Sequence, residues 1–293
     1  MNDTAPDAAP DCAPAQRIVR TPRERLPAGT CDCHLHVFGD RGRYPLDARR
    51  SYTPHVATLE EHRAVMAACG IERAVLVQPS VYGTDNSCML DALRDAAGEG
   101  DAYRGVAVPD AAASDEELLA MDALGVRGIR LNVVNPQVLA VDDGIALCTR
   151  MRSQGWHLQV HLMLARDGAT TLARLADRVD VPIVVDHFGR PQAVSALPQL
   201  LLDLVASGRV WVKLSAAYRI ARPEHARTDI EPFVDALVAA NPARLVWGSD
   251  WPHTELQATP HDADLVDLLV ATLPDATTLH RVCVDNPASL YGF

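Results

Sequence analysis

The sequence has one lysine, Lys213, among its 27 basic residues, and it has no run or cluster of basic side chains. Against these stand 38 acidic residues, so the net charge is −11. Proteins that bind nucleic acid carry a basic patch or stripe, and this chain lacks one. We therefore expect no nucleic-acid partner, and an anionic substrate would need positive charge supplied locally by the site.

Long apolar runs and paired cysteine motifs are absent as well. No stretch reaches the ~20 apolar residues of a membrane span, and the polar first 29 residues lack the apolar core of a signal peptide. The seven cysteines are odd in number and contain no CxxC pair. We expect reduced thiols and a cytoplasmic protein without membrane contact. The sequence sets no expectation for the oligomeric state.

The alternation of short apolar strands with amphipathic helices predicts one α/β domain. Residues 1–27 contain five prolines and predict a flexible N-terminal arm, whereas residues 28–293 predict the domain itself. Eight strands are expected, over Thr30–Phe38, Arg73–Pro79, Tyr103–Pro109, Val126–Val133, Trp156–Leu162, Val181–His187, Arg209–Ser215 and Arg244–Asp250. Most are near-continuous apolar runs, as in parallel strands that are buried on both faces.

Helical patterns lie between these strands. They are expected over Leu59–Cys69, Asn86–Ala97, Ser114–Leu124, Asp142–Gln154, Ala169–Val179, Ala196–Ala206, Ile230–Ala240 and His261–Leu273. Eight strand–helix units in about 250 residues are typical of a (β/α)8 TIM barrel, and the GxGxxG turn of a doubly wound sheet is missing after the first strand. The segment Thr277–Tyr291 predicts a further helix on the outside of the barrel.

Two histidines close the first expected strand. Strict alternation predicts that Asp32, His34 and His36 share the lumen face of the barrel. Cys31 and Cys33 then face the helices, as core residues rather than metal ligands. Two imidazoles at this spacing can reach one metal ion or one substrate oxygen.

Other polar side chains stand at the carboxyl ends of later strands, where a TIM barrel carries its chemistry. The fifth and sixth strands end at His161 and His187, and the eighth ends at Asp250. Together with the histidine pair of the first strand, they are expected to meet at one mouth and form a functional site.

Three arginines, Arg130, Arg190 and Arg219, lie at or just after strand ends. A guanidinium binds carboxylates through two hydrogen bonds and keeps its charge, so three of them at one mouth indicate an anionic substrate. The alternative is that they form salt bridges with acids of the rim, such as Asp186 or Asp250.

Three motifs resemble one known superfamily. DCHLHVF at 32–38, VDHFGRP at 185–191 and VWGSDWPH at 246–253 are similar to the amidohydrolase superfamily, in particular to its branch of sugar-lactone and 2-pyrone-4,6-dicarboxylate lactonases. The resemblance implies a TIM-barrel hydrolase that acts at the carbonyl of a small carboxylated lactone. It also implies that Asp250 is the base that activates water and that His34, His36 and His187 surround the reacting group. We expect His187, or a metal ion, to stabilise the oxyanion.

The resemblance also bears on metal. Binuclear members bridge two ions with a carboxylated lysine on the fourth strand, where this chain has none, so at most one ion is expected. Mononuclear members bind through the HxH pair, the fifth-strand histidine and the eighth-strand aspartate, which implies one Zn²⁺. Its ligands would be His34, His36, His161 and Asp250. The dicarboxylate lactonases work without metal, and the same groups would then hydrogen-bond the substrate carbonyl directly.

Two further positions, Tyr52 and Ser80, match residues that help to hold a substrate carboxylate in the lactonase branch. The dicarboxylate enzymes carry a basic pair after the fourth strand, where this chain has Asn135-Pro136, and this difference favours a related lactone. Two other hypotheses remain open from the same residues. One is a metal-dependent decarboxylase or C–C hydrolase, and the other is a binding barrel without catalysis.

Overall fold

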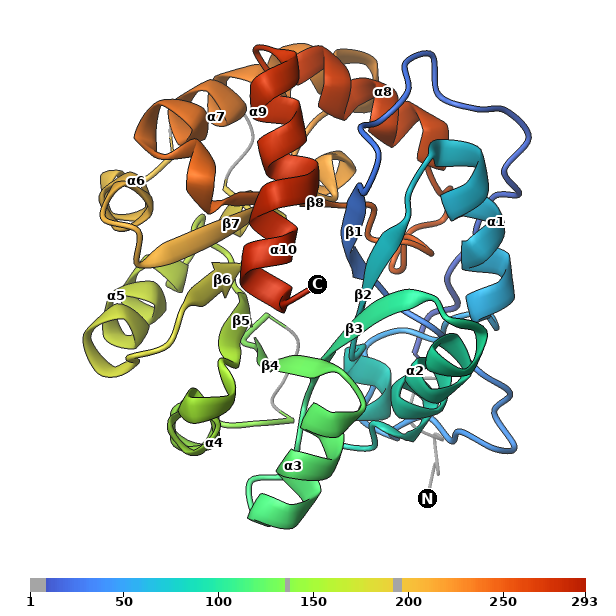
Figure 1. Cartoon of the computed structure of the whole chain (residues 1–293), viewed down its shortest axis with the longest axis vertical. Helices are drawn as coiled ribbons and strands as arrows, with labels where there is room; N and C mark the ends of the chain where they lie inside the picture. The colour runs from blue at the N-terminus through green and yellow to red at the C-terminus, as the bar shows by residue number, and fades with distance from the viewer. Residues whose placement is uncertain (1–8, 135–137, 192–196) are drawn as a thin grey trace, which may run out of the picture.

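The computed structural model describes residues 9–134, 138–191 and 197–293. Within them, eight parallel strands lie side by side in chain order, each hydrogen-bonded to the next (Figure 1). The strands are β1 (Cys31–Leu35), β2 (Arg73–Val77), β3 (Ala102–Ala107), β4 (Val126–Asn132), β5 (His157–His161), β6 (Ile183–Val185), β7 (Val210–Ser215) and β8 (Leu245–Gly248).

The chain after β8 closes the ring against β1. The N–H of Asp250 donates to the carbonyl of His34, and the N–H of His36 donates to the carbonyl of Trp251, both at 2.8 Å. Leu35 also forms a parallel bridge with Trp251. The predicted single-domain (β/α)8 barrel is therefore confirmed.

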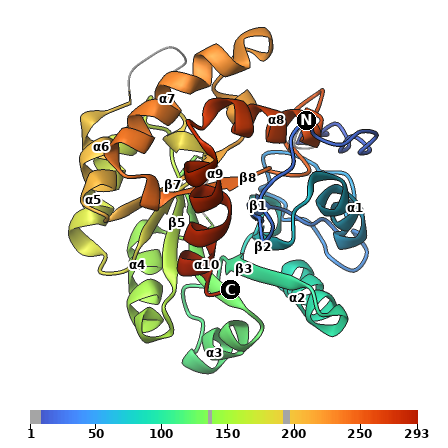
Figure 2. The same cartoon turned by 45° about the horizontal axis from the view of Figure 1, so that its top comes forward.

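Helices surround the strands in both views of the molecule (Figures 1 and 2). They are α1 (Leu59–Cys69), α2 (Ser87–Glu99), α3 (Asp115–Ala123), α4 (Val141–Arg150), α5 (Gly168–Arg178), α6 (Gln199–Ala206), α7 (Ala226–Ala240), α8 (Asp262–Thr272), α9 (Ala276–His280) and α10 (Asn286–Tyr291). Reciprocal capping boxes start two of them, Thr58 with Glu61 and Ser114 with Glu117. None of the helices that the structure describes has the length and apolar character to cross a bilayer.

The C-terminal segment covers the amino-terminal end of the barrel, with α10 drawn across the ring of strands in Figure 1. The prediction that this segment packs on the outside is wrong. Tyr291 is fully buried, and its ring centroid lies 5.2 Å from that of His157 on β5. Leu290 and Tyr291 share one apolar cluster with inward side chains of the strands, among them Cys31 and Val75. An eight-stranded barrel must fill its interior with side chains, and α10 supplies part of this filling.

The strict alternation predicted for β1 is also wrong. The pairing of β1 with β2 shifts register between Asp32 and Leu35, as at a β-bulge, where an extra residue turns the side chains that follow. Cys31 and Cys33 therefore lie in the apolar cluster of the lumen and not against the helices. His34 nevertheless reaches the lumen, because the irregularity lets two consecutive side chains point inward.

As a result, the side chain of Asp32 faces outward, where its hydrogen bonds connect β1 to the turn after β8. Its carboxylate accepts the N–H and the hydroxyl of Ser249, at 2.9 and 2.5 Å, and lies 3.4 Å from Nε2 of His62 on α1. It also accepts the N–H of His34 at 3.0 Å. This one carboxylate thus fixes the backbone on both sides of the mouth, next to His34 and Asp250.

The N-terminal segment from residue 9 onward contacts two loops at the mouth, and Figure 2 shows it beside α8. The N–H of Cys12 donates to the carbonyl of Thr53 at 2.9 Å, and that of Ala13 donates to the carbonyl of Leu256 at 2.8 Å. The Sγ of Cys12 accepts the N–H of Glu255 at 3.2 Å. Part of the segment 1–27 forms these contacts, and the flexibility expected for it remains a prediction.

Candidate active site

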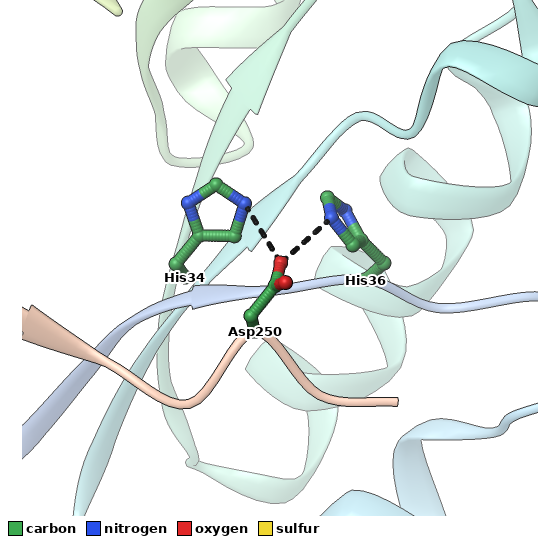
Figure 3. Close-up of side chains that lie close together, drawn as sticks. All are labelled: His34, His36 and Asp250. Atoms are coloured by element: carbon green, nitrogen blue, oxygen red, sulfur yellow. Dashed lines mark ion pairs between the residues drawn. The ribbon is translucent and has the colours of Figure 1, made fainter. Parts of the chain in front are cut away.

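Asp250 lies among three imidazoles at the carboxyl-terminal mouth of the barrel. Its Oδ1 is 3.5 Å from Nε2 of His34, 3.6 Å from Nε2 of His36 and 3.7 Å from Nε2 of His187. Figure 3 shows the rings of His34 and His36 turned toward this carboxylate. All four residues are at most 3% exposed. The structure thus brings together residues that the sequence places at the ends of three strands.

The backbone around Asp250 is held in a close and strained arrangement. A Cβ at Gly248 would lie 2.6 Å from the Cβ of His34 and 2.7 Å from its N atom, so only glycine lets β8 approach β1 here. Asp250 itself has φ +65°, in the left-handed region. Such a conformation costs a non-glycine residue about 1–3 kcal/mol and persists where the surrounding contacts over-determine it. The position of this carboxylate is therefore imposed by the fold.

The second oxygen of Asp250 is held by two donors. Its Oδ2 accepts the hydroxyl of Tyr218 at 2.6 Å and Nε of Arg219 at 3.0 Å. Burial acts to raise the pKa of Asp250, but the charge of Arg219 outweighs it and holds this pKa well below its ordinary value. The carboxylate is ionised at neutral pH, as a general base must be.

Two of the imidazoles that face the carboxylate, those of His34 and His187, are neutral. Burial lowers the pKa of His34 to about 3, although Asp186 acts in the opposite direction. Burial also lowers the pKa of His187 and of His161 well below its ordinary value. Neutral imidazole nitrogens keep a lone pair for a metal ion or for a hydrogen bond to substrate.

The geometry of the mouth fits one metal ion. Nε2 of His34 and Nε2 of His36 lie 3.5 and 3.6 Å from Oδ1 of Asp250, longer than the usual hydrogen bond but close to the ~3.3–3.6 Å between ligand atoms of a tetrahedral zinc ion. The ligand atoms of His34, His36 and Asp250 lie within 4.8 Å of one another, and Nε2 of His34 has no hydrogen-bond partner among the described residues. The structure does not bring His161 into this group: its Nε2 lies 3.4 Å from Nη1 of Arg190.

Asp186 supports His34 from the other side of its ring. Its Oδ1 lies 3.3 Å from Nδ1 of His34 and 3.8 Å from Nζ of Lys213, and its Oδ2 accepts Nε2 of Gln159 at 3.1 Å and Nη2 of Arg130 at 3.5 Å. Burial acts to raise the pKa of Asp186, but His34 and Lys213 hold it well below its ordinary value. Nδ1 of His34 thus faces this carboxylate and, at 3.4 Å, the ammonium of Lys213, whereas its Nε2 faces the mouth.

Sequence analysis did not assign Lys213 and Tyr218 to the site. For Lys213 a signal was present, because this charge interrupts the apolar run at 210–215 on the inward face that it shares with Trp211. Its Nζ donates to Oε1 of Gln159 and to the carbonyl of Cys33, both at 2.7 Å. Tyr218 carries no such signal, since its partner Asp250 is 32 positions away.

The three predicted arginines differ in their partners. Arg130 is buried and contacts Asp186, and Arg219 forms ion pairs with Asp250 and Glu255, at 3.0 and 3.1 Å. These two follow the salt-bridge alternative. Arg190 has no carboxylate partner within 4.0 Å among the described residues, so its guanidinium remains available to a ligand anion.

The predicted carboxylate-holding pair is also close together. Burial raises the pKa of Tyr52, and hydrogen bonds with Thr254 and Ser80 oppose that shift. The positive charge of Arg130 acts on the same hydroxyl. Asn135-Pro136, where the lactonase branch carries a basic pair, lies outside the described residues.

A TIM barrel with an HxH pair on β1, a histidine after β6 and an aspartate after β8 is the architecture of an amidohydrolase. The chain belongs to the amidohydrolase family, whose model matches residues 31–293, so the predicted resemblance is confirmed. Among its relatives, a 4-sulfomuconolactone hydrolase of Rhizobium radiobacter is 37% identical over 91% of each chain. A 2-pyrone-4,6-dicarboxylate hydrolase of Comamonas testosteroni is 33% identical over 92% of each chain. The crystal structure of a putative 2-pyrone-4,6-dicarboxylic acid hydrolase from Pseudomonas putida superposes with a TM-score of 0.79 at 33% identity, over 91% of this chain and 98% of the other.

Proposed function

We propose that the protein hydrolyses the ring ester of a small anionic lactone, with Asp250 as the base that activates water. The observation that carries this proposal is the state of Asp250: ionised, fixed at Oδ2 and directed at three imidazoles through Oδ1. The names of its relatives, hydrolases of 4-sulfomuconolactone and of 2-pyrone-4,6-dicarboxylate, support a lactone as substrate.

The chain's own groups account for the proton movements of the reaction. Oδ1 of Asp250 takes a proton from water as the oxygen attacks the ring carbonyl, and then returns it to the ring oxygen that leaves. His187 lies beside this path, with Nδ1 2.8 Å from the hydroxyl of Ser215. In the tautomer in which Ser215 donates, Nε2–H of His187 donates to the developing oxyanion.

One zinc ion fits this arrangement on His34, His36 and Asp250, and His161 stays a predicted fourth ligand. When bound, zinc lowers the pKa of water and polarises the carbonyl. In the metal-free alternative the same imidazoles hydrogen-bond the substrate carbonyl. The cytoplasmic location expected from the cysteines belongs to this proposal too, and it is supported by seven unpaired, buried thiols.

Arg190 is the proposed anchor for the negative charge of the substrate, and Tyr52 and Ser80 are further proposed substrate-binding residues. Arg130 and Arg219 contribute positive potential, although their guanidinium groups already contact acids.

The test is the Asp250→Asn variant, assayed by the ultraviolet change on ring opening of 4-sulfomuconolactone and 2-pyrone-4,6-dicarboxylate. We expect kcat to fall by about 10²–10⁴-fold, the usual contribution of a general base. Asp235→Asn, on the exposed face of α7, is the matched control and should keep wild-type activity. Near wild-type turnover by Asp250→Asn would refute the assignment, and release of carbon dioxide would favour the decarboxylase hypothesis.

A further inference from the structure

Behind Asp250, four side chains form a continuous row of polar contacts. The hydroxyl of Tyr218 donates to Oδ2 of Asp250 at 2.6 Å. The same hydroxyl lies 3.3 Å from Nδ1 of His253, whose Nε2 lies 3.1 Å from Oδ1 of Asp262. The row runs from the first residue of α8 to the mouth of the barrel.

The His253 and Asp262 members of this row are buried and do not lie on a solvated surface. His253 is fully buried and Asp262 is 3% exposed, and a buried imidazole or carboxylate is costly unless it is hydrogen-bonded. The ring of His253 meets that of Tyr218 edge-on, at a centroid distance of 5.6 Å and an angle of 87°. The N–H of His253 also donates to the carbonyl of Asp250 at 2.8 Å.

The row ends on the oxygen of Asp250 that does not face the imidazoles. A carboxylate that turned about its Cβ–Cγ bond would exchange Oδ1 and Oδ2, or point neither at the mouth. Tyr218 and Arg219 together prevent this rotation, because both donate to Oδ2. Arg219 also forms an ion pair with Glu255. Of the two donors to Oδ2, Tyr218 lies at the shorter distance, 2.6 Å against 3.0 Å.

We infer that Tyr218 is a positioning residue for Asp250, and that His253 and Asp262 hold Tyr218 in place; this inference rests on the proposed role of Asp250. The His253–Asp262 pair fixes the side of the hydroxyl that faces away from the mouth. The hydroxyl then fixes the carboxylate, so that one oxygen is always presented to water or to a metal ion. The pair acts on the reaction only through the tyrosine.

The test compares Tyr218→Phe, Asp262→Asn and the double variant, with kcat and KM on the two lactones and zinc affinity by calorimetry. A hydrogen bond to a charged group contributes about 1.5–3 kcal/mol, so Tyr218→Phe should lower kcat or zinc affinity by about 10–100-fold with KM within about threefold. Asp262→Asn should cause a smaller loss, and it should cause no further loss once the hydroxyl is absent. A purely structural role of Asp262 would instead give losses that multiply in the double variant.

Tyr44→Phe is the matched control, because its hydroxyl also donates to an aspartate, Asp91, at 2.8 Å, and lies outside the site. It should leave kcat and zinc affinity unchanged. If Asp262→Asn does not fold, His253→Gln takes its place in the same cycle. Circular dichroism and the melting temperature verify folding of each variant.

The outcomes separate the inference from the proposed function. If the wild-type protein is active and Tyr218→Phe keeps kcat and zinc affinity within about twofold of the wild-type values, the positioning role of Tyr218 is refuted and the proposed function stands. Losses that multiply would overturn the link from Asp262 to Tyr218. A wild-type protein that neither hydrolyses these lactones nor binds zinc would overturn the inference together with the proposed function.

Discussion

The ammonium of Lys213 lies 3.8 Å from Oδ1 of Asp186, and both side chains are fully buried in the barrel. The only lysine of the chain thus compensates a carboxylate that supports His34. Removing one member of a buried group of charges is destabilising, because the charges that remain are less well compensated, even though Arg130 still lies 3.5 Å from Asp186.

Lys213→Met should therefore lower the free energy of unfolding by about 3–5 kcal/mol, measured by urea denaturation. Arg227→Met, which breaks an exposed pair with Glu231 on α7, is the control and should cost less than about 1 kcal/mol. A single variant as stable as the wild type would show that the ammonium compensates no buried charge.

Arg190→Met should raise KM for an anionic lactone by about 10–100-fold, because it removes a charge-assisted hydrogen bond of about 1.5–3 kcal/mol. The effect on kcat should be small, since the guanidinium does not contact Asp250. Arg166→Met, an exposed arginine after β5, serves as the control and should leave KM unchanged. An unchanged KM for the Arg190 variant would place the anion site elsewhere in the mouth.

Protein purified without a histidine tag should contain about one zinc ion per chain by elemental analysis. His36→Ala removes a proposed ligand and should weaken zinc binding at least ~100-fold, beyond the usual effect of losing a supporting contact. His280→Ala, on the exposed end of α9, should bind zinc as the wild type does. If zinc-free protein is fully active and chelators do not inhibit it, the metal-free alternative is established.

The pH dependence of stability should come largely from buried neutral histidines, of which His157 is remote from the mouth. Burial, together with Lys213, lowers the pKa of His157 to about 3, and neither ring nitrogen has a hydrogen-bond partner among the described residues. The folded protein therefore rejects a proton that the unfolded chain binds below pH ~6.5. The contribution to stability is complete above that pH and is lost progressively as the pH falls toward 3.

Each such histidine should add up to ~1.4 kcal/mol of destabilisation per pH unit within this window. Urea denaturation at several pH values between 7.5 and 5 measures the slope. His157→Gln should reduce it, and the exposed His55→Gln should not. A slope that His157→Gln leaves unchanged would mean that the folded barrel accommodates the imidazolium.

The strands and their order were predictable because each strand is an apolar run of the right length, separated from the next by a helical pattern. The position of α10 was not, because periodicity identifies an amphipathic helix without saying which surface it covers. The register shift in β1 was hidden for a related reason. A bulge depends on how β1 pairs with β2, and the amino-acid sequence at 31–35 does not indicate it.

Much of the site followed from one rule, that barrel chemistry lies at the carboxyl ends of strands. This rule placed His34, His36, His187 and Asp250 at one mouth. Partner choice could not be predicted in the same way. Arg219 and Arg190 follow strand ends alike, yet among the described residues only the first forms an ion pair with a carboxylate, because that choice depends on where loops bring side chains in space.

The closure of the barrel floor by α10 bears on how the chain is synthesised. Ribosomes deliver all eight strands before Leu290 and Tyr291, so the walls exist before the side chains that complete their interior. Until then, Cys31 and Val75 face the part of the lumen that Leu290 and Tyr291 later cover. A nascent chain halted after β8 would present this apolar opening to chaperones, and the arrival of α10 would end that exposure.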